Sequence, residues 1–278
     1  MEVIDPAMTV KVTGQIGLIL FILFILRSNK IHPPLLKLIR KINVNNLYFK
    51  DNAREFHTNF LRVFKRIGPH DEPIVSVIIG SLLGDAYCNK RRGGGCRICF
   101  RQSSIHKEYL FWLYDFFFIR GYCSDLKPRL YLRKIKNYEK IYTGYEFNTY
   151  TFLSFNWIYD LFYKNGKKII NSEIENYITP LSLAIWIMDD GGWVQHGIRI
   201  SSNAFTYNEV LLLTQILHRK FKIETTIQKL SKPTNLHQNS IYNNKYSIYI
   251  TSSSVSLVRS LVLPYTHSSM VYKLGIKD

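Results

Sequence analysis

The sequence is poor in cysteine, in acidic residues and in long apolar runs, and each shortage excludes a class of protein. Four cysteines are too few for a disulfide scaffold in a chain of 278 residues, so we expect a reducing compartment. The apolar run at residues 16–26 is shorter than the roughly 20 residues that cross a bilayer. No basic cluster precedes this run and no cleavage site of small residues follows it. The sequence therefore predicts neither a signal peptide nor a stable membrane partner.

Acidic residues are outnumbered, with 20 Asp and Glu against 37 Lys and Arg, which gives a formal net charge of +17. A positive excess of this size favours a polyanionic partner, namely DNA, RNA or an anionic membrane surface. Hydrophobic residues make up 46% of the chain, which excludes wholesale disorder. The length allows one large domain or two small ones, and either can bury a sizeable core.

Alanine is also scarce, with five in the whole chain, whereas Ile, Lys, Asn, Tyr and Phe are abundant. These abundant residues have A/T-rich codons, so this coding argument predicts an AT-rich genome such as that of an organelle. Residues 27–70 carry ten Lys and Arg against only Asp51 and Glu55. We interpret this stretch as a basic arm that lies on phosphates or, equally, as an ordinary solvated extension.

From residue 71 onward the chain contains a near-repeat with a long period. The first copy is DEPIVSVIIGSLLGDAY (71–87) and the second is ITPLSLAIWIMDDGGW (178–193). Each copy opens with a helix-start residue and a proline, continues with about ten apolar or small residues, and ends at an aspartate, Asp85 or Asp190. The two copies therefore predict two equivalent buried helices.

The two helices are natural partners, because Gly80 and Gly84 form a face that permits close backbone approach. If the helices pack side by side and parallel, Asp85 and Asp190 converge. A helix C-terminus disfavours an aspartate, and two such ends add like-charge repulsion. A divalent cation would reverse that penalty, because Mg²⁺ and Ca²⁺ prefer oxygen ligands. We therefore predict a metal site shared by the two halves, the alternative being two independent helix stops.

A similar pattern of strands and helices follows each copy. The first half predicts strands near 87–92, 96–102, 127–135 and 144–152, with helices at 105–120 and 155–163. The second half predicts strands near 193–203, 223–230 and 245–251, with helices at 206–219 and 253–263. TYNE at residues 206–209 is a capping box before the helix at 206–219.

Strand alternation predicts one apolar face toward helices and one face rich in Arg, Lys and Tyr. Acidic residues look scarce on that basic face, which suits a sheet laid in the DNA major groove, where arginine reads guanine. In the strand near 127–135, Leu130 and Leu132 are expected on the covered apolar face. The candidate DNA-binding residues are Arg97, Arg101, Arg129, Tyr131, Arg133, Arg199 and Lys245.

Two other motifs give weaker predictions. Cys96-x-x-Cys99 is reminiscent of a zinc site, but there is no second close pair, and residues three apart in a strand point to opposite faces. We therefore expect reduced cysteines in a β-ribbon. The run Gly93–Gly95 predicts a hairpin turn and lacks the lysine, serine and helix start of a phosphate loop.

IIGSLLGDAY and LAIWIMDDGG resemble the two signature helices of the LAGLIDADG homing endonucleases, in the single-chain, double-motif branch of omega-type mitochondrial intron enzymes. The resemblance extends through ENYITPLSLAIWIMDDGG, SSNAFTYNEVLLLTQILHRKFKI and SSMVYKLGI, and covers roughly residues 71–276. The second signature departs from the family pattern at Ile185 and Trp186, where small residues are typical of the helix crossing. Ala86 replaces the terminal glycine of the first signature.

The resemblance implies an α+β fold of two pseudo-symmetric αββαββα halves, with a saddle of β-ribbons around the paired signature helices. It implies a monomer that binds double-stranded DNA and hydrolyses one phosphodiester per strand with Mg²⁺, leaving short 3′ overhangs and promoting intron mobility. Asp85 and Asp190 match the metal-binding acidic positions, and Gly84 and Asp189 would offer backbone carbonyls. Lys273 matches one basic residue of the family's active site, and the other is Lys168 or its neighbour, with Lys168 preferred.

The resemblance also sets the expected domain boundaries. VIDPAMTVKVTG (3–14) is similar to a stretch of cytochrome oxidase subunit II, which implies an exon-derived leader over 1–27. A basic extension over 28–70 would precede the endonuclease domain at 71–278, with halves 71–166 and 177–278 and a linker at 167–176. A mitochondrial, organelle-encoded protein follows from this reading. The alternative function is an RNA maturase that binds its host group I intron RNA and assists splicing.

Overall fold

A computed structural model of the chain describes residues 68–134, 141–229 and 245–276. The predicted leader, the apolar run at 16–26 and nearly all of the basic extension lie outside these ranges. In the first half the elements are α4 (Glu72–Leu83), β1 (Tyr87–Lys90), β2 (Cys96–Ser103), α5 (Lys107–Phe118), β3 (Arg129–Lys134), β4 (Ile141–Asn148) and α6 (Asn156–Phe162). In the second half they are α7 (Pro180–Asp190), β7 (Gly191–Val194), β8 (Gly197–Ser201), α8 (Tyr207–Phe221), β9 (Thr225–Lys229), β10 (Tyr246–Ile250) and α9 (Ser252–Val262).

Short elements connect and close the halves. A two-stranded hairpin of β5 (Tyr163–Lys164) and β6 (Lys167–Lys168) and the 3₁₀ helix η4 (Ser172–Tyr177) lie between them. The remaining 3₁₀ helices are η2 (Ser104–His106), η3 (Leu153–Phe155), η5 (Leu263–Tyr265) and η6 (Ser268–Leu274). Within the described ranges, no helix combines the length and the apolar character needed to cross a bilayer.

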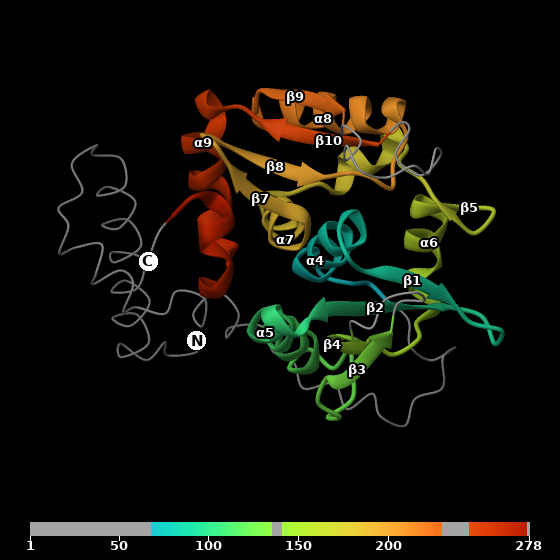
Figure 1. Cartoon of the computed structure of the whole chain (residues 1–278). Helices are drawn as coiled ribbons and strands as arrows, with labels where there is room; N and C mark the ends of the chain where they lie inside the picture. Colours follow the sequence, from blue (N-terminus) through green and yellow to red (C-terminus); the bar gives the residue numbers. More distant parts are fainter. Residues whose placement is uncertain (1–67, 135–140, 230–244, 277–278) are drawn as a thin grey trace, which may run out of the picture. The chain divides into compact units, whose positions relative to one another are not determined.

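The two halves have the same topology, which confirms the predicted α+β fold with its αββαββα repeat. The strand order is β1-β2-β4-β3 in one antiparallel sheet and β7-β8-β10-β9 in the other. Both sheets place their second and fourth strands at the centre. Figure 1 shows α4 and α7 side by side, with one sheet beside each of them.

The signature helices α4 and α7 are parallel and in contact along their length. Near their N-terminal ends Thr179 Oγ1 donates to Ser76 Oγ at 2.9 Å, and beyond their C-terminal ends Asp85 N donates to Asp189 Oδ2 at 3.4 Å. Thr179 also forms a capping box with Ser182, which fixes where α7 begins. Parallel packing brings both acidic ends to one place, as the sequence predicted.

The close approach of the helices depends on Gly80. A Cβ built at position 80 would lie 2.4 Å from Ser182 O and 2.8 Å from Ile185 Cβ, so a side chain there must separate the backbones. The bulk of Ile185 in the second signature is therefore accommodated by the glycine of the first. Trp186 is fully buried as well, and does not prevent the contact.

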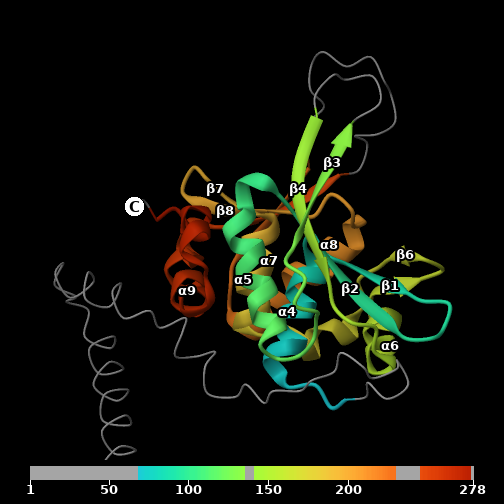
Figure 2. The ribbon, with the colours of Figure 1, turned by 90° about the horizontal axis from the view of Figure 1, so that it is seen from below.

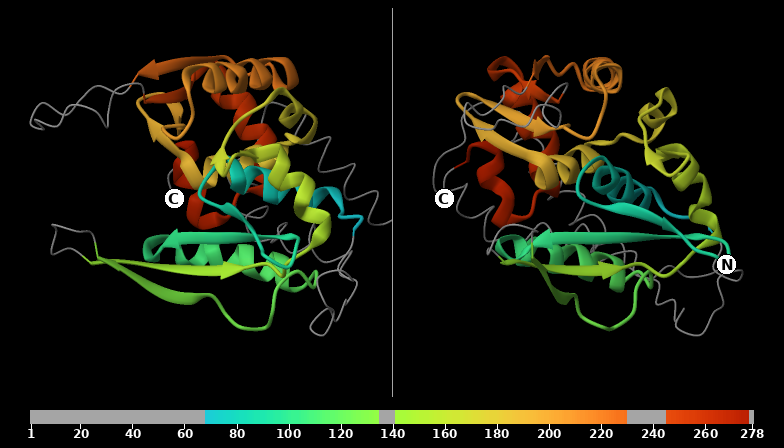
Figure 3. Two further views of the ribbon diagram at one scale, coloured as in Figure 1. Left: turned by 90° about the vertical axis from the view of Figure 1, so that its right-hand side faces the viewer. Right: turned by 45° about the vertical axis from the view of Figure 1, so that its right-hand side comes forward.

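Helices cover one face of each sheet. Ile198, Ile200, Ile248 and Ile250 on β8 and β10 are fully buried, as strand alternation predicted. Figure 3 shows the helices layered against the sheets in two further orientations.

The expectation for β3 was wrong. Leu130 and Leu132, predicted to face helices, are 55% and 66% exposed. In Figure 2 the described ends of β3 and β4 extend beyond the end of α5, and no helix of the described ranges covers them. The alternation of the strand is as predicted, but its apolar face has no layer to pack on.

Replacing Gly80 by alanine is expected to lower the free energy of unfolding by about 1–3 kcal/mol, the usual effect of overpacking a tight contact. The matched control is Gly93→Ala, because a Cβ at position 93 would meet no atom within 4 Å. Urea unfolding monitored by tryptophan fluorescence measures both variants. Equal stability of the two variants would contradict the close helix crossing.

Candidate active site and nucleic-acid interface

Three aspartates meet at the C-terminal ends of α4 and α7. Asp85 follows the first helix, and Asp189 and Asp190 end the second. Gln102, from the end of β2, links the two helices, since its Nε2 lies 2.9 Å from Asp85 Oδ2 and 3.0 Å from Asp189 Oδ1. The helices thus deliver carboxylates from both halves to one cluster, as the sequence predicted.

The cluster raises the pKa of its acids. Burial and, after it, the charge of Asp85 together raise the pKa of Asp190 to about 7. Burial, followed by the charges of Asp85 and Asp190, holds the pKa of Asp189 well above its ordinary value. Asp85 faces solvent in part, but the atoms packed around its carboxyl also raise its pKa. Like-charged carboxyls with little water around them favour protonation or a bound cation.

Lys168 and Lys273 bind the ends of the two signature helices in matching ways. Lys168 Nζ donates to Leu82 O at 2.7 Å and to Ala86 O at 3.0 Å. Lys273 Nζ donates to Met188 O and, at 2.8 Å, to Asp189 O. Burial lowers the pKa of both lysines, while the nearby aspartates oppose that shift. Each ammonium therefore offsets the negative end of a helix beside the carboxylate cluster.

Lys168, not its neighbour, reaches the cluster. Strand alternation in the β5–β6 hairpin turns Lys168 inward, whereas Lys167 is exposed. The spacing of the sequence alone left these two lysines unresolved. The pairing of β5 with β6 decides between the two lysines, because it places Lys168 opposite Tyr163 and Lys167 opposite Lys164.

Asp189 and Gly84 occupy equivalent positions, each directly before the terminal aspartate of its signature. A Cβ at position 84 would lie 2.5 Å from Asp189 Cβ, so the glycine leaves room for the aspartate of the other helix. The sequence analysis assigned both residues as sources of metal-binding carbonyls. In the structure the main-chain carbonyl of Asp189 accepts a hydrogen bond from Lys273. The Asp189 carboxyl accepts from Gln102, from Tyr109 Oη at 2.9 Å and from Asp85 N.

The described residues offer a cation a limited set of side chains. Among the ranges that the structure describes, no group of three or more His, Cys, Asp or Glu side chains is arranged to hold a metal ion. The donor chemistry of Asp85 and Asp190 suits Mg²⁺ nonetheless, because both are oxygen ligands with raised pKa values. Any cation here would need main-chain or substrate oxygens to complete its coordination.

Arg101 and Arg129, both predicted to bind DNA, lie on a sheet face that also contains an acid that was not predicted. The register places Arg101 and Arg129 on either side of Glu146. Arg101 Nε donates to Glu146 Oε2 at 2.5 Å, and Arg129 Nε donates to Oε1 at 2.6 Å. Burial opposes the effect, but these hydrogen bonds hold the pKa of Glu146 below its ordinary value. Glu146 therefore fixes two of the predicted readers.

Aromatic rings support the same face. The Arg101 guanidinium lies over Tyr87 and Tyr131, 5.4 and 5.7 Å from the ring centroids. The Tyr131 ring lies where a Cβ on Gly144 would be, so this glycine lets the ring lie across the sheet. Arg133, which is exposed, continues the face along β3.

The second half presents a more neutral face. Arg199 Nε donates to Gln228 Oε1 at 3.1 Å, so an amide occupies the place of an acid. Lys245 is half-buried and directly precedes β10. Arg97 lies at the first-half hairpin between β1 and β2, opposite Asn89. The structure thus places the predicted readers on strands, except Lys245, which directly precedes one.

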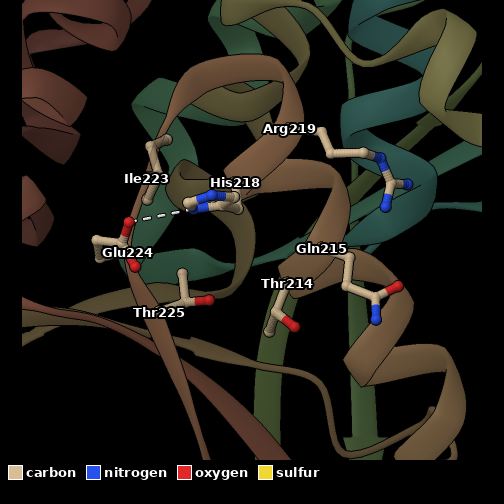
Figure 4. Close-up of a pocket in the computed structure, with 7 residues that line it drawn as sticks. All are labelled: Thr214, Gln215, His218, Arg219, Ile223, Glu224 and Thr225. Atoms are coloured by element: carbon tan, nitrogen blue, oxygen red, sulfur yellow. Dashed lines mark ion pairs between the residues drawn. The ribbon is translucent and has the colours of Figure 1, made fainter.

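The cysteines form part of the core. All four are free and buried, and Cys96 Sγ donates to Asn156 Oδ1 at 3.3 Å. Figure 4 shows a separate hollow between α8 and β9, where His218 Nδ1 pairs with Glu224 Oε1 at 3.1 Å. Arg219, at the rim of that hollow, pairs with Glu175. None of the signature residues lines this hollow.

Sequence reasoning missed Gln102, Tyr109 and Glu146. Gln102 lies on the face of β2 that was predicted to be apolar, and Tyr109 is a buried aromatic within a helix. Neither carries a motif, so only the fold reveals that they meet Asp189. Glu146 carried a usable signal, because an acid within an Arg-rich strand pattern is unusual enough to indicate an ion pair.

Comparison with known proteins places this arrangement in a family. Residues 75–257 match the model of the LAGLIDADG DNA endonuclease family. The intron-encoded endonuclease ai4 of Dictyostelium discoideum is 45% identical over 168 residues, which are 59% of this chain and 99% of the relative. The cytochrome b mRNA maturase bI2 of Saccharomyces cerevisiae is 37% identical over 255 residues, or 89% of this chain, and this chain spans 57% of the yeast protein's length.

A solved structure gives the same answer. The homing endonuclease I-WcaI bound to its DNA recognition sequence superposes with a TM-score of 0.67 and 26% identity, covering 85% of this chain and all of that one. The signature helices, the two matching sheets and these similarities agree. The chain belongs to the LAGLIDADG DNA endonuclease family.

Proposed function

We propose that this protein is a site-specific homing endonuclease, encoded in an organellar intron, that cuts both strands of double-stranded DNA with Mg²⁺ and leaves short 3′ overhangs. The observation that carries the proposal is the meeting of Asp85 with Asp189 and Asp190 at the ends of two parallel helices. Such a cut at an intronless allele would promote intron mobility. One chain carries both signatures, which supports action as a monomer.

Asp85 and Asp190 are the residues that would hold Mg²⁺, with the main-chain carbonyl of Gly84 beside the first. The Asp189 carbonyl already accepts from Lys273, so one lone pair remains for a cation. Bound Mg²⁺ would ease deprotonation of a water and offset charge on the attacking and leaving oxygens. Each half supplies one of the two carboxylates, which suits one cut per strand.

The lysines act beside the carboxylates. An ammonium has three N–H groups, and in each lysine two of them bind helix-end carbonyls. One N–H of Lys168 and one of Lys273 therefore remain for a phosphate oxygen or a water. Held there, the two charges would offset the negative charge that develops on phosphorus oxygens during cleavage.

The basic strand faces supply binding. Arg101, Arg129 and Arg133 share one face of the first sheet, and Arg199 lies on the second. Phosphate contacts from such residues give salt-dependent affinity, and base contacts give specificity. The fixed position of Arg101 and Arg129 on Glu146 favours a base-reading role, because both guanidiniums are held before DNA arrives.

A second function is supported by one observation. The yeast relative that matches 89% of this chain is a cytochrome b mRNA maturase. A basic β-sheet binds structured RNA as well as DNA, so assistance to splicing of the host group I intron is the alternative activity. The cytochrome b relatives and the A/T-biased composition together favour a mitochondrial location.

Asp85→Asn is expected to reduce cleavage of a cloned intronless exon junction by at least about 100-fold, because the amide cannot supply a charged oxygen ligand. DNA binding should persist and should weaken steeply as salt rises. Asp160→Asn, which changes an exposed carboxyl of α6, is the matched control and should cut like wild type. Full cleavage by Asp85→Asn, or no Mg²⁺-dependent cleavage by wild type, would contradict the proposal.

The stability of the metal-free protein is expected to fall as pH rises from about 4 to about 8. The fold raises the pKa of Asp190 to about 7 from an ordinary value of 3.8. The folded state thus holds a proton that the unfolded state releases, and the stability that this proton provides is lost as pH rises through 7.

Asp190→Asn should make this pH dependence shallower, and Mg²⁺ should restore stability to wild type at pH 8 but not to the variant. Urea unfolding with and without a chelator at pH 5 and pH 8 measures both effects. An identical pH dependence in variant and wild type would show that the raised pKa of Asp190 does not cause the loss of stability at high pH.

A further inference from the structure

The two catalytic centres are not equivalent, although the fold that holds them repeats. Asp85 and Asp190 have matching positions, and two residues beyond them lie Tyr87 and Gly192. Tyr87 pairs with Cys99 on β2, and Gly192 pairs with Arg199 on β8. The paired strands therefore align residue for residue, which allows each side chain of one centre to be compared with its counterpart.

The counterpart of Gln102 cannot do what Gln102 does. Three residues beyond Cys99 is Gln102, and three residues beyond Arg199 is Ser202. Gln102 Nε2 reaches two carboxylates, whereas the buried Ser202 hydroxyl donates to Tyr246 O at 2.9 Å. A serine is also too short to bridge two helix ends. The second centre thus lacks the donor that the first has.

The counterparts of Tyr109 and Asp189 differ in the same sense. The position that corresponds to Tyr109, seven residues beyond Gln102, is Glu209 in the second half, and it accepts from Ile170 N at 2.9 Å. The position that corresponds to Asp189 is Gly84, which has no side chain. Asp189 therefore reaches across from the second helix into the centre of the first, and nothing reaches back.

These contacts form one chain of hydrogen bonds that ends on Asp85. Tyr109 donates to Asp189 Oδ1, Gln102 donates to that same oxygen and to Asp85 Oδ2, and Asp85 N donates to Asp189 Oδ2. The Gln102 amide nitrogen carries two N–H groups, so it can donate one to each of the two carboxyls. Gln102 thereby holds the Asp85 carboxylate, and Asp189 holds both Gln102 and the Asp85 main chain.

Asp190 has no such support. Among the described residues its carboxyl makes no hydrogen bond, and what acts on it is burial together with nearby charges, those of Asp85, Lys273 and Lys168 among them. A group that is held in place before substrate binds needs less reorganisation during the reaction. The Asp85 centre therefore starts closer to its working geometry than the Asp190 centre does.

We propose that Asp189 is a positioning residue for the opposite half, and that with Gln102 and Tyr109 it pre-organises the Asp85 centre alone. The inference rests on the proposed endonuclease function. Its consequence is that the two DNA strands are cut by unequal centres. A substitution in Asp189, Gln102 or Tyr109, which we call the relay, then slows cleavage of one strand and leaves cleavage of the other unchanged. A relay variant then accumulates nicked DNA.

The test uses the full-length protein and a plasmid with the intronless junction, with each strand end-labelled in separate reactions. Tyr109→Phe removes one oxygen and Gln102→Met removes the amide while keeping length. Each is expected to slow the same strand by about 10- to 100-fold, the usual effect of losing a supporting hydrogen bond behind a metal ligand. The rate on the other strand should stay within about twofold of wild type.

The matched control is Ser202→Ala, which changes the counterpart of Gln102 and should leave the ratio of the two strand rates unchanged. Asp189→Asn keeps one acceptor oxygen, whereas Asp189→Ala keeps none. The affected strand should therefore be cut faster by Asp189→Asn than by Asp189→Ala. A role in folding alone would lower both strand rates together with the unfolding temperature. The ratio of strand rates therefore separates positioning from stability.

A metal-free readout accompanies the kinetics. The side-chain amide protons of Gln102, followed by ¹⁵N–¹H NMR without divalent cations, should shift and exchange faster in Tyr109→Phe and in Asp189→Ala than in wild type. Unchanged amide signals, or equal slowing of both strands, would overturn the relay while leaving the endonuclease function intact. A junction that wild-type protein fails to cut would overturn the proposed function and this inference with it.

Discussion

Crowding of acidic groups at the C-terminal ends of two buried parallel helices is the constraint on which the rest of the structure depends. A helix end repels an aspartate and two aspartates repel each other, so this meeting is unfavourable without a compensating charge. The structure supplies Lys168 and Lys273 to the helix-end carbonyls and leaves the carboxyls with raised pKa values. We propose that this cluster is kept for cation-assisted phosphodiester cleavage.

The two sheets and the helix pair depend on one another through a few close contacts. Gly80 lets α4 and α7 approach, Gly84 makes room for Asp189, and the end of β2 delivers Gln102 between the helix ends. The same strand carries Arg101 on its other face, where Glu146 holds it beside Arg129. The proposed binding and cleavage groups thus share one strand, which would couple the position of DNA on the sheet to the position of the carboxylates.

Much of this could be read from the sequence because it is periodic. Two apolar runs that end in aspartate predicted the helix pair, and strand alternation predicted the buried isoleucines of β8 and β10. The errors arose where packing decides. Leu130 and Leu132 follow the alternation of residues that pack under a helix, but both are exposed, and β3 and β4 extend past the end of α5. Gln102 and Tyr109 have no local signal, because their partner Asp189 lies 80 or more residues away and meets them only in the folded chain.

The central claim is that Asp85 and Asp190 together hold divalent cations over DNA. The most direct measurement is titration of Mn²⁺ into the complex with the intronless junction, following the free ion by electron paramagnetic resonance. Wild-type complex is expected to take up Mn²⁺ beyond what the DNA alone binds, and the Asp85→Asn, Asp190→Asn double variant is not. Equal uptake by the two complexes would contradict the account.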